Sequence, residues 1–364
     1  MRIIFTARDV GAAKQNLAFA KSCIEHKLDF ECIALTEGPA RAVFDSSAFI
    51  NYAFDLKSKI KNNSTSNIVE QKIGEFSPDF VIVGLSYSGE GIDELVRHIC
   101  IEKKIPCGVL QDYWGYLGRF SVEELPDYFF VIDEQAKYLT EKKTKNTANC
   151  IVTGSVKHEA YSRMFTEWDS NKPLSYNENT SIVFIGQPSE ITGILTNFEI
   201  LVDVVGEIEG SIKLFFKPHP ADYDFIELYE KVLVKQNINY EILAREVDVE
   251  PVLCQADIIV TCFSTSGFDH NHLQYYADRP LGNLIYLIVG SEIQGFIEKI
   301  VGVAAIPSAV DGMGAVCKSK RELRVALNRC INGDDLGYRE SVLQCLSLKQ
   351  SPARFIYNYI QSVI

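Results

Sequence analysis

A single imidazole stands between two prolines in the segment Lys217-Pro218-His219-Pro220. The apolar residues 212–216 before it are typical of a buried strand, which the prolines then end. Because proline restricts the residue that precedes it, Lys217 and His219 are both held extended. A histidine fixed where a strand leaves a sheet can exchange protons with a ligand near neutral pH. The alternative is a loop histidine that bonds only to backbone groups, and the sequence leaves it open.

A carboxylate among aromatic residues is the second candidate. Asp112 follows an apolar run in the segment Gln111–Tyr116, which also holds two tyrosines, a tryptophan and a glycine. Neighbouring rings exclude part of the water around Asp112 and thereby raise its affinity for a proton. Such a carboxylate suits a general base that takes the proton of an acceptor hydroxyl group. An aspartate that only caps a helix or a turn would fit the same pattern.

Two turns of small residues are candidates for holding a phosphate. Ser264, Thr265 and Ser266 follow an apolar strand and lead into a helix, so their hydroxyl and free N–H groups can surround an anion. Gly186 and Gln187 begin another turn at a strand end, where the chain can approach a nucleotide closely. Plain connections between strand and helix remain the alternative at both places.

Three further residues are held in reserve, and two more histidines are considered as metal ligands. Gly11 belongs to a turn that only loosely resembles a phosphate loop, and Glu90 stands between two glycines as a second candidate base. His158 either lines a cleft or lies on the surface of a helix. His270 and His272 lack a convincing third ligand, so we do not expect a zinc site.

Three of these segments resemble, in the same order, motifs of bacterial sialyltransferases. Gln111–Tyr116 resembles their acidic-glycine motif, although Tyr113 stands where the family has a glycine after the acid. Lys217–Pro220 looks like their His-Pro motif, and Ser264–Ser266 looks like their paired Ser/Thr motif. The same pattern recurs in bacterial Kdo transferases, and in part in the glycerol- and ribitol-phosphate polymerases of wall teichoic acid.

The resemblance implies a GT-B fold, in which two Rossmann-like domains face a cleft. It implies an inverting glycosyltransferase that moves an acidic sugar, of the sialic acid or Kdo type, from a CMP-activated donor to a glycan or glycolipid acceptor in bacterial surface polysaccharide synthesis. Asp112 would be the base, or Glu90 in its place, and His219 would serve the leaving phosphate. Lys217, Pro220 and the turns at 186–187 and 264–266 would hold the nucleotide. No metal cofactor is implied, because a CMP donor carries one phosphate.

Strand and helix signals alternate along most of the chain, which predicts an α/β protein with parallel sheets. We expect a first, acceptor-binding domain over residues 1–165 and a second, nucleotide-sugar domain over residues 180–350. The polar stretch between them reads as a linker. The last strands are expected at 284–288 and 304–306. A final helix over 351–364 would cross back to the first domain, as the resemblance implies.

Composition excludes several classes of protein. Hydrophobic residues make up 47% and charged residues 23%, as in globular proteins, and a net charge of −12 argues against a nucleic-acid partner. No GxGxxG, Walker A or GxSxG motif occurs. The ten cysteines form no CxxC pair, which favours free thiols in a reducing cytoplasm. No apolar run predicts a signal peptide or a membrane span, and contact with the inner membrane surface stays open.

Three other functions remain open from the residues alone. A CDP-polyol phosphate transferase would need a second catalytic histidine, for which His270 and His272 are available. A UDP-sugar 2-epimerase or hydrolase shares the doubled Rossmann architecture and would need further acidic and histidine residues. In a non-catalytic protein that binds sugar nucleotides, Asp112 would be dispensable.

Overall fold

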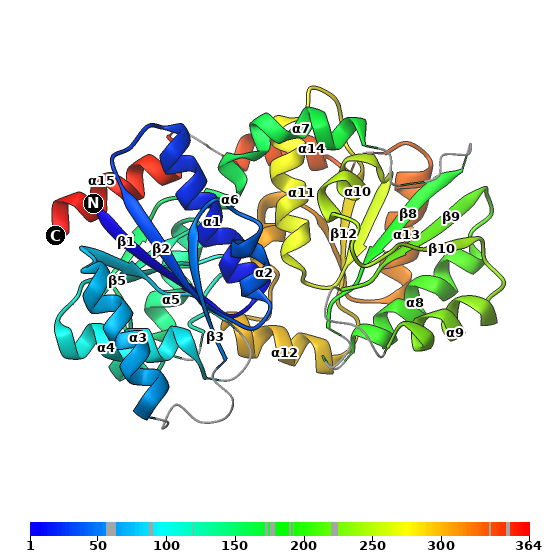
Figure 1. Ribbon diagram of the computed structural model, residues 1–364. Coiled ribbons are helices and arrows are strands. Elements are labelled where there is room, and N and C mark those ends of the chain that lie inside the picture. Colours follow the sequence, from blue (N-terminus) through cyan, green and yellow to red (C-terminus); the bar gives the residue numbers. More distant parts are fainter. Residues whose placement is uncertain are drawn as a thin grey trace. The chain divides into compact units, whose positions relative to one another are not determined.

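A computed structural model of the chain describes residues 1–55, 63–86, 90–118, 120–171, 174, 179–188, 191, 193–219, 225–334, 336–346 and 350–364, with the backbone alone for 63–65. The chain forms two compact units. Unit 1 comprises Met1–Ala160 and Leu348–Ile364, and unit 2 comprises Tyr161–Ser347. Each unit contains one parallel sheet with helices packed on it, as the alternation of strand and helix signals predicts (Figure 1).

The sheet of unit 1 has seven parallel strands in the order β3-β2-β1-β4-β5-β6-β7. Its central strands are runs of apolar residues that are buried on both faces, which is why they pair in parallel beneath helices. The strands are β1 (Arg2–Ala7), β2 (Glu31–Glu37), β3 (Ile50–Phe54), β4 (Phe80–Ile82), β5 (Cys107–Leu110), β6 (Tyr128–Val131) and β7 (Cys150–Val152).

Two helices of unit 1 begin at aspartate side chains that accept from free N–H groups. Asp9 caps the first helix by accepting from the Ala12 N–H at 2.8 Å, and Asp133 caps the fifth in the same way. The helices are α1 (Val10–Glu25), α2 (Ala40–Asp45), α3 (Asn63–Phe76), α4 (Ile92–Lys103), α5 (Glu134–Lys143), α6 (Val156–Glu159) and α15 (Pro352–Val363).

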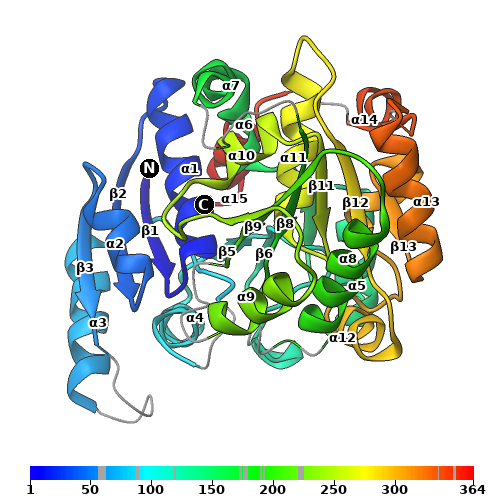
Figure 2. The same ribbon diagram turned by 90° about the vertical axis from the view of Figure 1, so that its right-hand side faces the viewer.

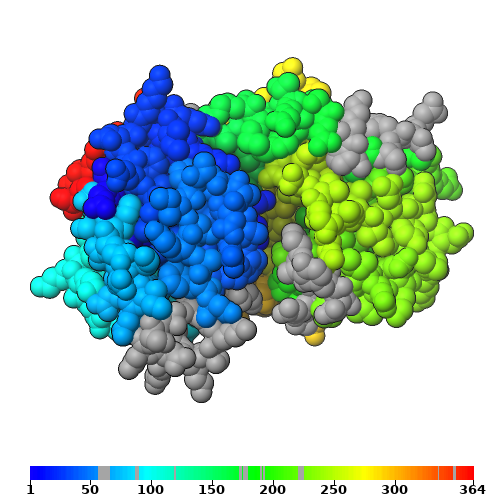
Figure 3. All heavy atoms as spheres, viewed as in Figure 1, coloured from blue at the N-terminus to red at the C-terminus, as the bar shows by residue number. Residues whose placement is uncertain are grey.

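The sheet of unit 2 has six parallel strands in the order β10-β9-β8-β11-β12-β13 (Figure 2). The strands are β8 (Thr180–Ile185), β9 (Ile212–Lys217), β10 (Tyr240–Ile242), β11 (Ile258–Thr261), β12 (Asn283–Leu287) and β13 (Ala315–Cys317). The helices are α7 (Tyr161–Ser170), α8 (Ile194–Glu207), α9 (Ile226–Lys235), α10 (Val249–Gln255), α11 (Thr265–Tyr276), α12 (Ser291–Val301), α13 (Lys320–Ile331) and α14 (Tyr338–Cys345). Helix α7 lies on the surface of its unit (green in Figure 3) and buries Tyr161 and Phe165.

Two strand predictions differ from the structure. Residues 304–306 are not a strand, because Pro307 starts a 3-10 helix directly after them, and the last strand is β13 instead. The sequence analysis also missed β3, a short edge strand with exposed and half-buried side chains. Strands β3 and β13 have five and three residues, which is too short for a clear pattern of apolar residues in the sequence.

Helix α15 belongs to unit 1 although almost two hundred residues of unit 2 precede it. Ala353, Ile356 and Ile360 are fully buried, and they pack into the same apolar cluster as Phe5 and Phe19. The hydroxyl of Tyr357 adds a hydrogen bond of 2.7 Å to the Asp29 carbonyl. The helix thus closes one side of the core of unit 1 (red in Figure 1).

Glu159 ties the start of α15 to the end of α6. Its carboxylate accepts from the Ser351 hydroxyl at 2.6 Å and from the Ala353 N–H at 3.1 Å. It also meets Nε2 of His26, at the end of α1, at 2.5 Å. Glu159 is the second-to-last residue of the first segment of unit 1, so the two points where the chain leaves and re-enters this unit are held together.

Replacing Ile356 by alanine should lower the free energy of unfolding of unit 1 by about 3 kcal/mol, because a fully buried side chain is lost and a cavity remains. Ile364, which is 51% exposed, provides the control, and its alanine variant should change stability by less than about 0.5 kcal/mol. Urea unfolding followed by circular dichroism measures both. Equal, small losses would mean that α15 does not contribute to the core.

Candidate functional site

The loops of unit 2 that the sequence analysis singled out follow neighbouring strands. From β8 the chain proceeds outward through β9 and β10, and from β11 it proceeds the other way through β12 and β13. The strand order therefore reverses between β8 and β11. In open parallel sheets a ligand binds outside the carboxyl ends of the strands at such a reversal. Gly186 and Gln187 follow β8, His219 follows β9, and Ser264 follows β11.

Gly186 allows the ends of β8 and β9 to approach closely. Its N–H donates to the Lys217 carbonyl at 2.9 Å. A Cβ atom at this position would lie 3.1 Å from that carbonyl oxygen and 3.2 Å from the backbone nitrogen of His219. A side chain there would push His219 away, so the glycine fixes where the half-buried imidazole starts.

Gln187 joins the β8 turn to the turn after β11. Its side chain is buried, and Oε1 accepts from the Phe263 N–H at 2.9 Å. Phe263 directly precedes Ser264, whose Oγ accepts from the Ser266 N–H at 3.2 Å and caps α11. Thr265 is exposed in the first turn of this helix. The three predicted turns of unit 2 are thus linked, and the positive end of the α11 dipole lies among them.

Lys217, which the sequence analysis expects to hold the nucleotide, lies at the end of β9, and its predicted role stays a prediction. Its side chain is buried, and Nζ donates to the Arg245 carbonyl at 2.9 Å and to the Pro218 carbonyl at 3.3 Å. These bonds fasten the chain after β10 to the end of β9. Pro220 lies outside the described residues, so its predicted role stays a prediction.

His270 and His272 are buried inside α11 rather than placed at a strand end. His270 bonds through Nε2 to the Gly282 carbonyl at 2.7 Å, and its ring stacks on Tyr338 with 5.5 Å between ring centroids. Burial lowers the pKa of His270 to about 4, so the ring is neutral near pH 7. His272 bonds through Nδ1 to the Phe268 carbonyl at 3.0 Å. Neither imidazole offers the exposed second base that a CDP-polyol phosphate transferase would need.

In unit 1 the strand order reverses between β1 and β4, and Asp112 lies close to this point. A Cβ atom placed on Gly11, in the first turn of α1, would be 3.6 Å from Oδ2 of Asp112 and 3.6 Å from Oδ1 of Asp9. The two carboxylates therefore flank the exposed Gly11 at the positive end of the helix. Their charge disfavours a phosphate at this turn.

The aromatic segment that carries Asp112 is held by buried polar contacts. Nε1 of Trp114 donates to both carboxylate oxygens of Asp133, at 2.9 and 3.1 Å. Nε2 of Gln111 donates to the Tyr116 carbonyl at 3.0 Å and to the Thr140 hydroxyl at 2.9 Å. Burial raises the pKa of Asp133, while the bonds from the Ala136 N–H and Trp114 partly offset it.

The sequence analysis missed a buried charge cluster beside this segment. Asp93 is fully buried and accepts from Thr6 Oγ1 at 2.6 Å, Ser86 Oγ at 2.7 Å, the Gly84 N–H at 3.2 Å and Nε of Arg8 at 3.3 Å. Nη2 of Arg8 also meets Oε1 of Glu94 at 3.1 Å. Burial raises the pKa of Glu94, against the opposing effects of the Gly91 N–H and Arg8. In the sequence, the charged residue Arg8 directly after the first apolar strand could have indicated a buried ion pair.

Two further candidates of unit 1 are His158 and Glu90. His158, in α6, is buried and bonds through Nδ1 to the Ser155 hydroxyl at 2.7 Å. Glu90 is exposed just before α4. Asp112 belongs to unit 1 and His219 to unit 2, and their joint action on one substrate stays a prediction from the sequence.

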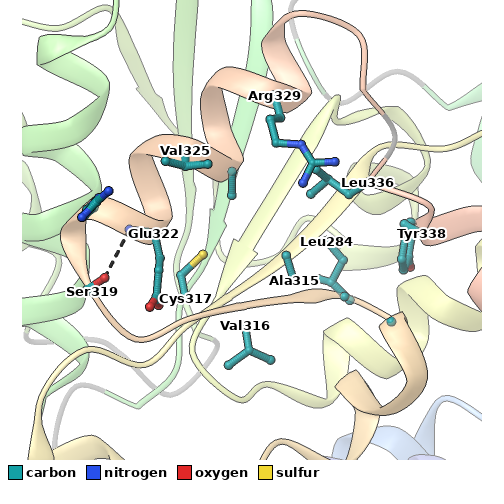
Figure 4. A pocket seen from close by; sticks show the side chains of 14 residues that line it. Leu284, Ala315, Val316, Cys317, Ser319, Glu322, Val325, Arg329, Leu336 and Tyr338 are labelled. Carbon is teal, nitrogen blue, oxygen red and sulfur yellow. Dashed lines mark hydrogen bonds between the residues drawn. The ribbon is translucent and has the colours of Figure 1, made fainter.

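A pocket of about 700 Å³ in unit 2 lies elsewhere, between α13 and β13 (Figure 4). Its walls include Leu284, Val316, Val325, Arg329 and Tyr338, and it contains none of the predicted site residues. Among the described residues, no three histidine, cysteine, aspartate or glutamate side chains come together as metal ligands would. Metal independence therefore stays a prediction. Over the same residues, no helix has the length and apolar character to cross a membrane.

Comparison with known proteins yields matches only among solved structures. No protein-family model and no curated protein matches the chain. A UDP co-structure of S. aureus MnaA is 16% identical with a TM-score of 0.67, covering 100% of this chain and 96% of that one. The UDP-GlcNAc 2-epimerase of Neisseria meningitidis bound to UDP-GlcNAc is 12% identical with a TM-score of 0.66. MurG of Acinetobacter baumannii is 12% identical with a TM-score of 0.61. The matches to this MurG and to the Neisseria epimerase cover 100% of this chain and 100% of the other chain.

These similarities confirm the predicted fold class: two Rossmann-like α/β units of the GT-B type. The predicted transfer of an acidic sugar from a CMP donor is wrong. UDP-GlcNAc 2-epimerases recur among the similar structures, and the structures described with a nucleotide carry UDP or UDP-GlcNAc. The specific resemblance to sialyltransferases and Kdo transferases receives no support from the similar structures.

The pKa of His270 gives a pH dependence of stability with a defined sign. The unfolded chain binds a proton at this residue below about pH 6.5, whereas the folded chain does so only near pH 4. The stabilisation is therefore complete above pH 6.5 and is lost as the pH falls toward 4. Between pH 7 and pH 5 this group alone should lower the free energy of unfolding by about 2 kcal/mol.

Urea unfolding at pH 7 and pH 5 measures this change. His270→Gln should remove the part of the slope that belongs to the buried ring. His98, which is exposed on α4, is the control, and His98→Gln should leave the slope almost unchanged. An unchanged slope in His270→Gln would contradict the neutral, buried state of His270.

Proposed function

We propose that this protein is a UDP-sugar 2-epimerase-like enzyme that acts on a UDP-N-acetylhexosamine such as UDP-GlcNAc. The observation that carries the proposal is the set of linked turns at the strand reversal of unit 2. Ser264 caps α11 there, beside the turns of Gln187 and His219. The recurrence of UDP-GlcNAc 2-epimerases among proteins of the same fold supports it.

Charge favours unit 2 over unit 1 for the diphosphate of the nucleotide. The first turn of α11 presents hydroxyl groups and N–H groups, and the helix dipole adds partial positive charge. The corresponding end of α1 in unit 1 carries the carboxylates of Asp9 and Asp112. A dianionic phosphate group binds more favourably to the first of these helix ends.

Inversion at C2 of the sugar requires that the C2–H bond break and form again on the opposite face. If UDP leaves C1 as a base takes the C2 proton, the electron pair of the C–H bond becomes a C1=C2 double bond, and the C1–O pair leaves with UDP. Addition of UDP to C1 and of a proton to the opposite face of C2 then gives the epimer. Binding groups for the leaving diphosphate, such as His219 and the turn at 264–266, would stabilise this step. Asp112 is the proposed proton acceptor, with Glu90 as the second candidate.

Nucleotide binding is the first test. UDP at one hundred times its dissociation constant should stabilise the folded chain by about 2.7 kcal/mol, which a thermal-shift assay detects as a higher Tm. Ser264→Ala should weaken UDP binding by about tenfold, since a charge-assisted hydrogen bond contributes about 1.5–3 kcal/mol. A shift with CMP and none with UDP would overturn the proposal.

Ser319→Ala is the matched control for Ser264→Ala. Ser319 caps α13 in the same unit by accepting from the Glu322 N–H at 3.2 Å. Either substitution should cost about 1 kcal/mol of stability through the lost cap, but only Ser264→Ala should change the affinity for UDP. Equal losses of affinity in both variants would place the effect in folding rather than in phosphate binding.

Proton exchange is the second test. UDP-GlcNAc incubated with the protein in D2O should acquire deuterium at C2 and form the C2 epimer, both visible by proton NMR. Asp112→Asn should lower kcat at least a hundredfold and leave UDP affinity unchanged, because it removes the proton acceptor alone. Full activity in Asp112→Asn together with loss in Glu90→Gln would assign the base to Glu90.

A further inference from the structure

Ser86, which lies just beyond β4 and is almost fully buried, connects two strand-end loops of unit 1 through its hydroxyl group. The Oγ atom accepts from the N–H of Arg8 at 3.1 Å and from the N–H of Asp9 at 3.4 Å. It donates its proton to Oδ2 of Asp93 at 2.7 Å. The loop after β1 and the loop after β4 are therefore fixed to each other at one atom.

The backbone of Ser86 connects the third loop. Its carbonyl accepts from the Tyr116 hydroxyl at 3.2 Å. The carbonyl of Tyr116 in turn accepts from Nε2 of Gln111. Asp112 lies between Gln111 and Tyr116, so the segment that carries it is closed on itself and anchored to Ser86.

These contacts fix the backbone of the segment that carries Asp112. Through Ser86, the loop after β5 is held against the loop that carries Asp9 and Gly11. The result is the placement of Asp112 Oδ2 and Asp9 Oδ1 at 3.6 Å from the Cβ position of Gly11. A group that takes a proton from carbon must be held to a fraction of an ångström, because small displacements cost large factors in rate.

We propose that Ser86 and Tyr116 are positioning residues that hold the Asp112 carboxylate at the start of α1 for proton transfer. The inference rests on the proposed function, in which Asp112 accepts the C2 proton. Ser86 and Tyr116 do not contact the substrate in this scheme. They act through the hydrogen bond that joins them and through the bonds of Ser86 to the β1 loop.

The matched pair Tyr116→Phe and Tyr357→Phe tests the inference. Each substitution removes one phenol that donates to a backbone carbonyl within unit 1, of Ser86 in the first case and of Asp29 in the second. Ser86 follows a strand at the carboxyl edge of the sheet, whereas Asp29 precedes β2 at the amino edge. Each variant thus loses one hydrogen bond from a tyrosine hydroxyl to a backbone carbonyl, at the carboxyl ends of the strands in Tyr116→Phe and at the amino ends in Tyr357→Phe.

Tyr116→Phe should lower kcat for UDP-GlcNAc epimerisation by about tenfold and leave both KM and the affinity for UDP unchanged. Tyr357→Phe should retain the wild-type kcat. Ser86→Ala should lower kcat further at unchanged KM, since it frees the β1 loop as well. If Ser86→Ala does not fold, the two tyrosine variants still decide the question.

The outcomes separate the two proposals. If the wild-type chain epimerises UDP-GlcNAc and both tyrosine variants lose kcat alike, or neither does, the positioning role is wrong and the proposed function stands. A rise in KM without a fall in kcat in Tyr116→Phe would also overturn it. If the wild-type chain neither binds UDP nor exchanges the C2 proton, the proposed function fails and the inference falls with it.

Discussion

The buried carboxylate of Asp93 is the constraint on which the strand-end loops of unit 1 depend. A charge removed from water is tolerated only if its oxygens are fully bonded, and Asp93 has four donors from β1, from the chain after β1 and from the chain after β4. The donors belong to segments that neighbour each other only in the folded sheet. The charge thus makes any other arrangement of these loops expensive, and in this way specifies their geometry.

In unit 2, uncharged groups hold the strand-end turns in place relative to each other. Gly186, Gln187 and Phe263 join its three strand-end turns through backbone hydrogen bonds and one buried amide. None of these described groups is a carboxylate. Among the described residues, the start of α1 is flanked by the carboxylates of Asp9 and Asp112, whereas the start of α11 carries hydroxyl and N–H groups.

The sequence predicted the fold class because parallel strands buried on both faces leave long apolar runs, as in β1, β9 and β11. It predicted the turns after β8, β9 and β11 because glycine, proline and serine mark strand ends locally. It did not reveal Asp93, since a helical aspartate in the sequence Ile-Asp-Glu-Leu looks like an exposed residue. Its burial arises from Thr6 and Arg8, more than eighty residues earlier.

The nature of the ligand was the least predictable feature. Short motifs such as Lys217–Pro220 describe how a strand ends, and proline ends a strand whatever the ligand of the protein is. Lys217 illustrates this: the sequence placed it at the strand end, but only the structure shows that its ammonium group bonds to the Arg245 carbonyl. A motif fixes the backbone more reliably than it fixes the direction of a side chain.

The contacts of Glu159 with Ser351 and Ala353 give the chain the organisation of an inserted domain. Because the exit from unit 1 and the return to it lie beside each other, residues 161–347 occupy what amounts to a surface loop of a smaller Rossmann-like protein. A short peptide bridge across that loop would leave every strand of the seven-stranded sheet in place. The last helix thus completes the core of the unit that the first 160 residues begin.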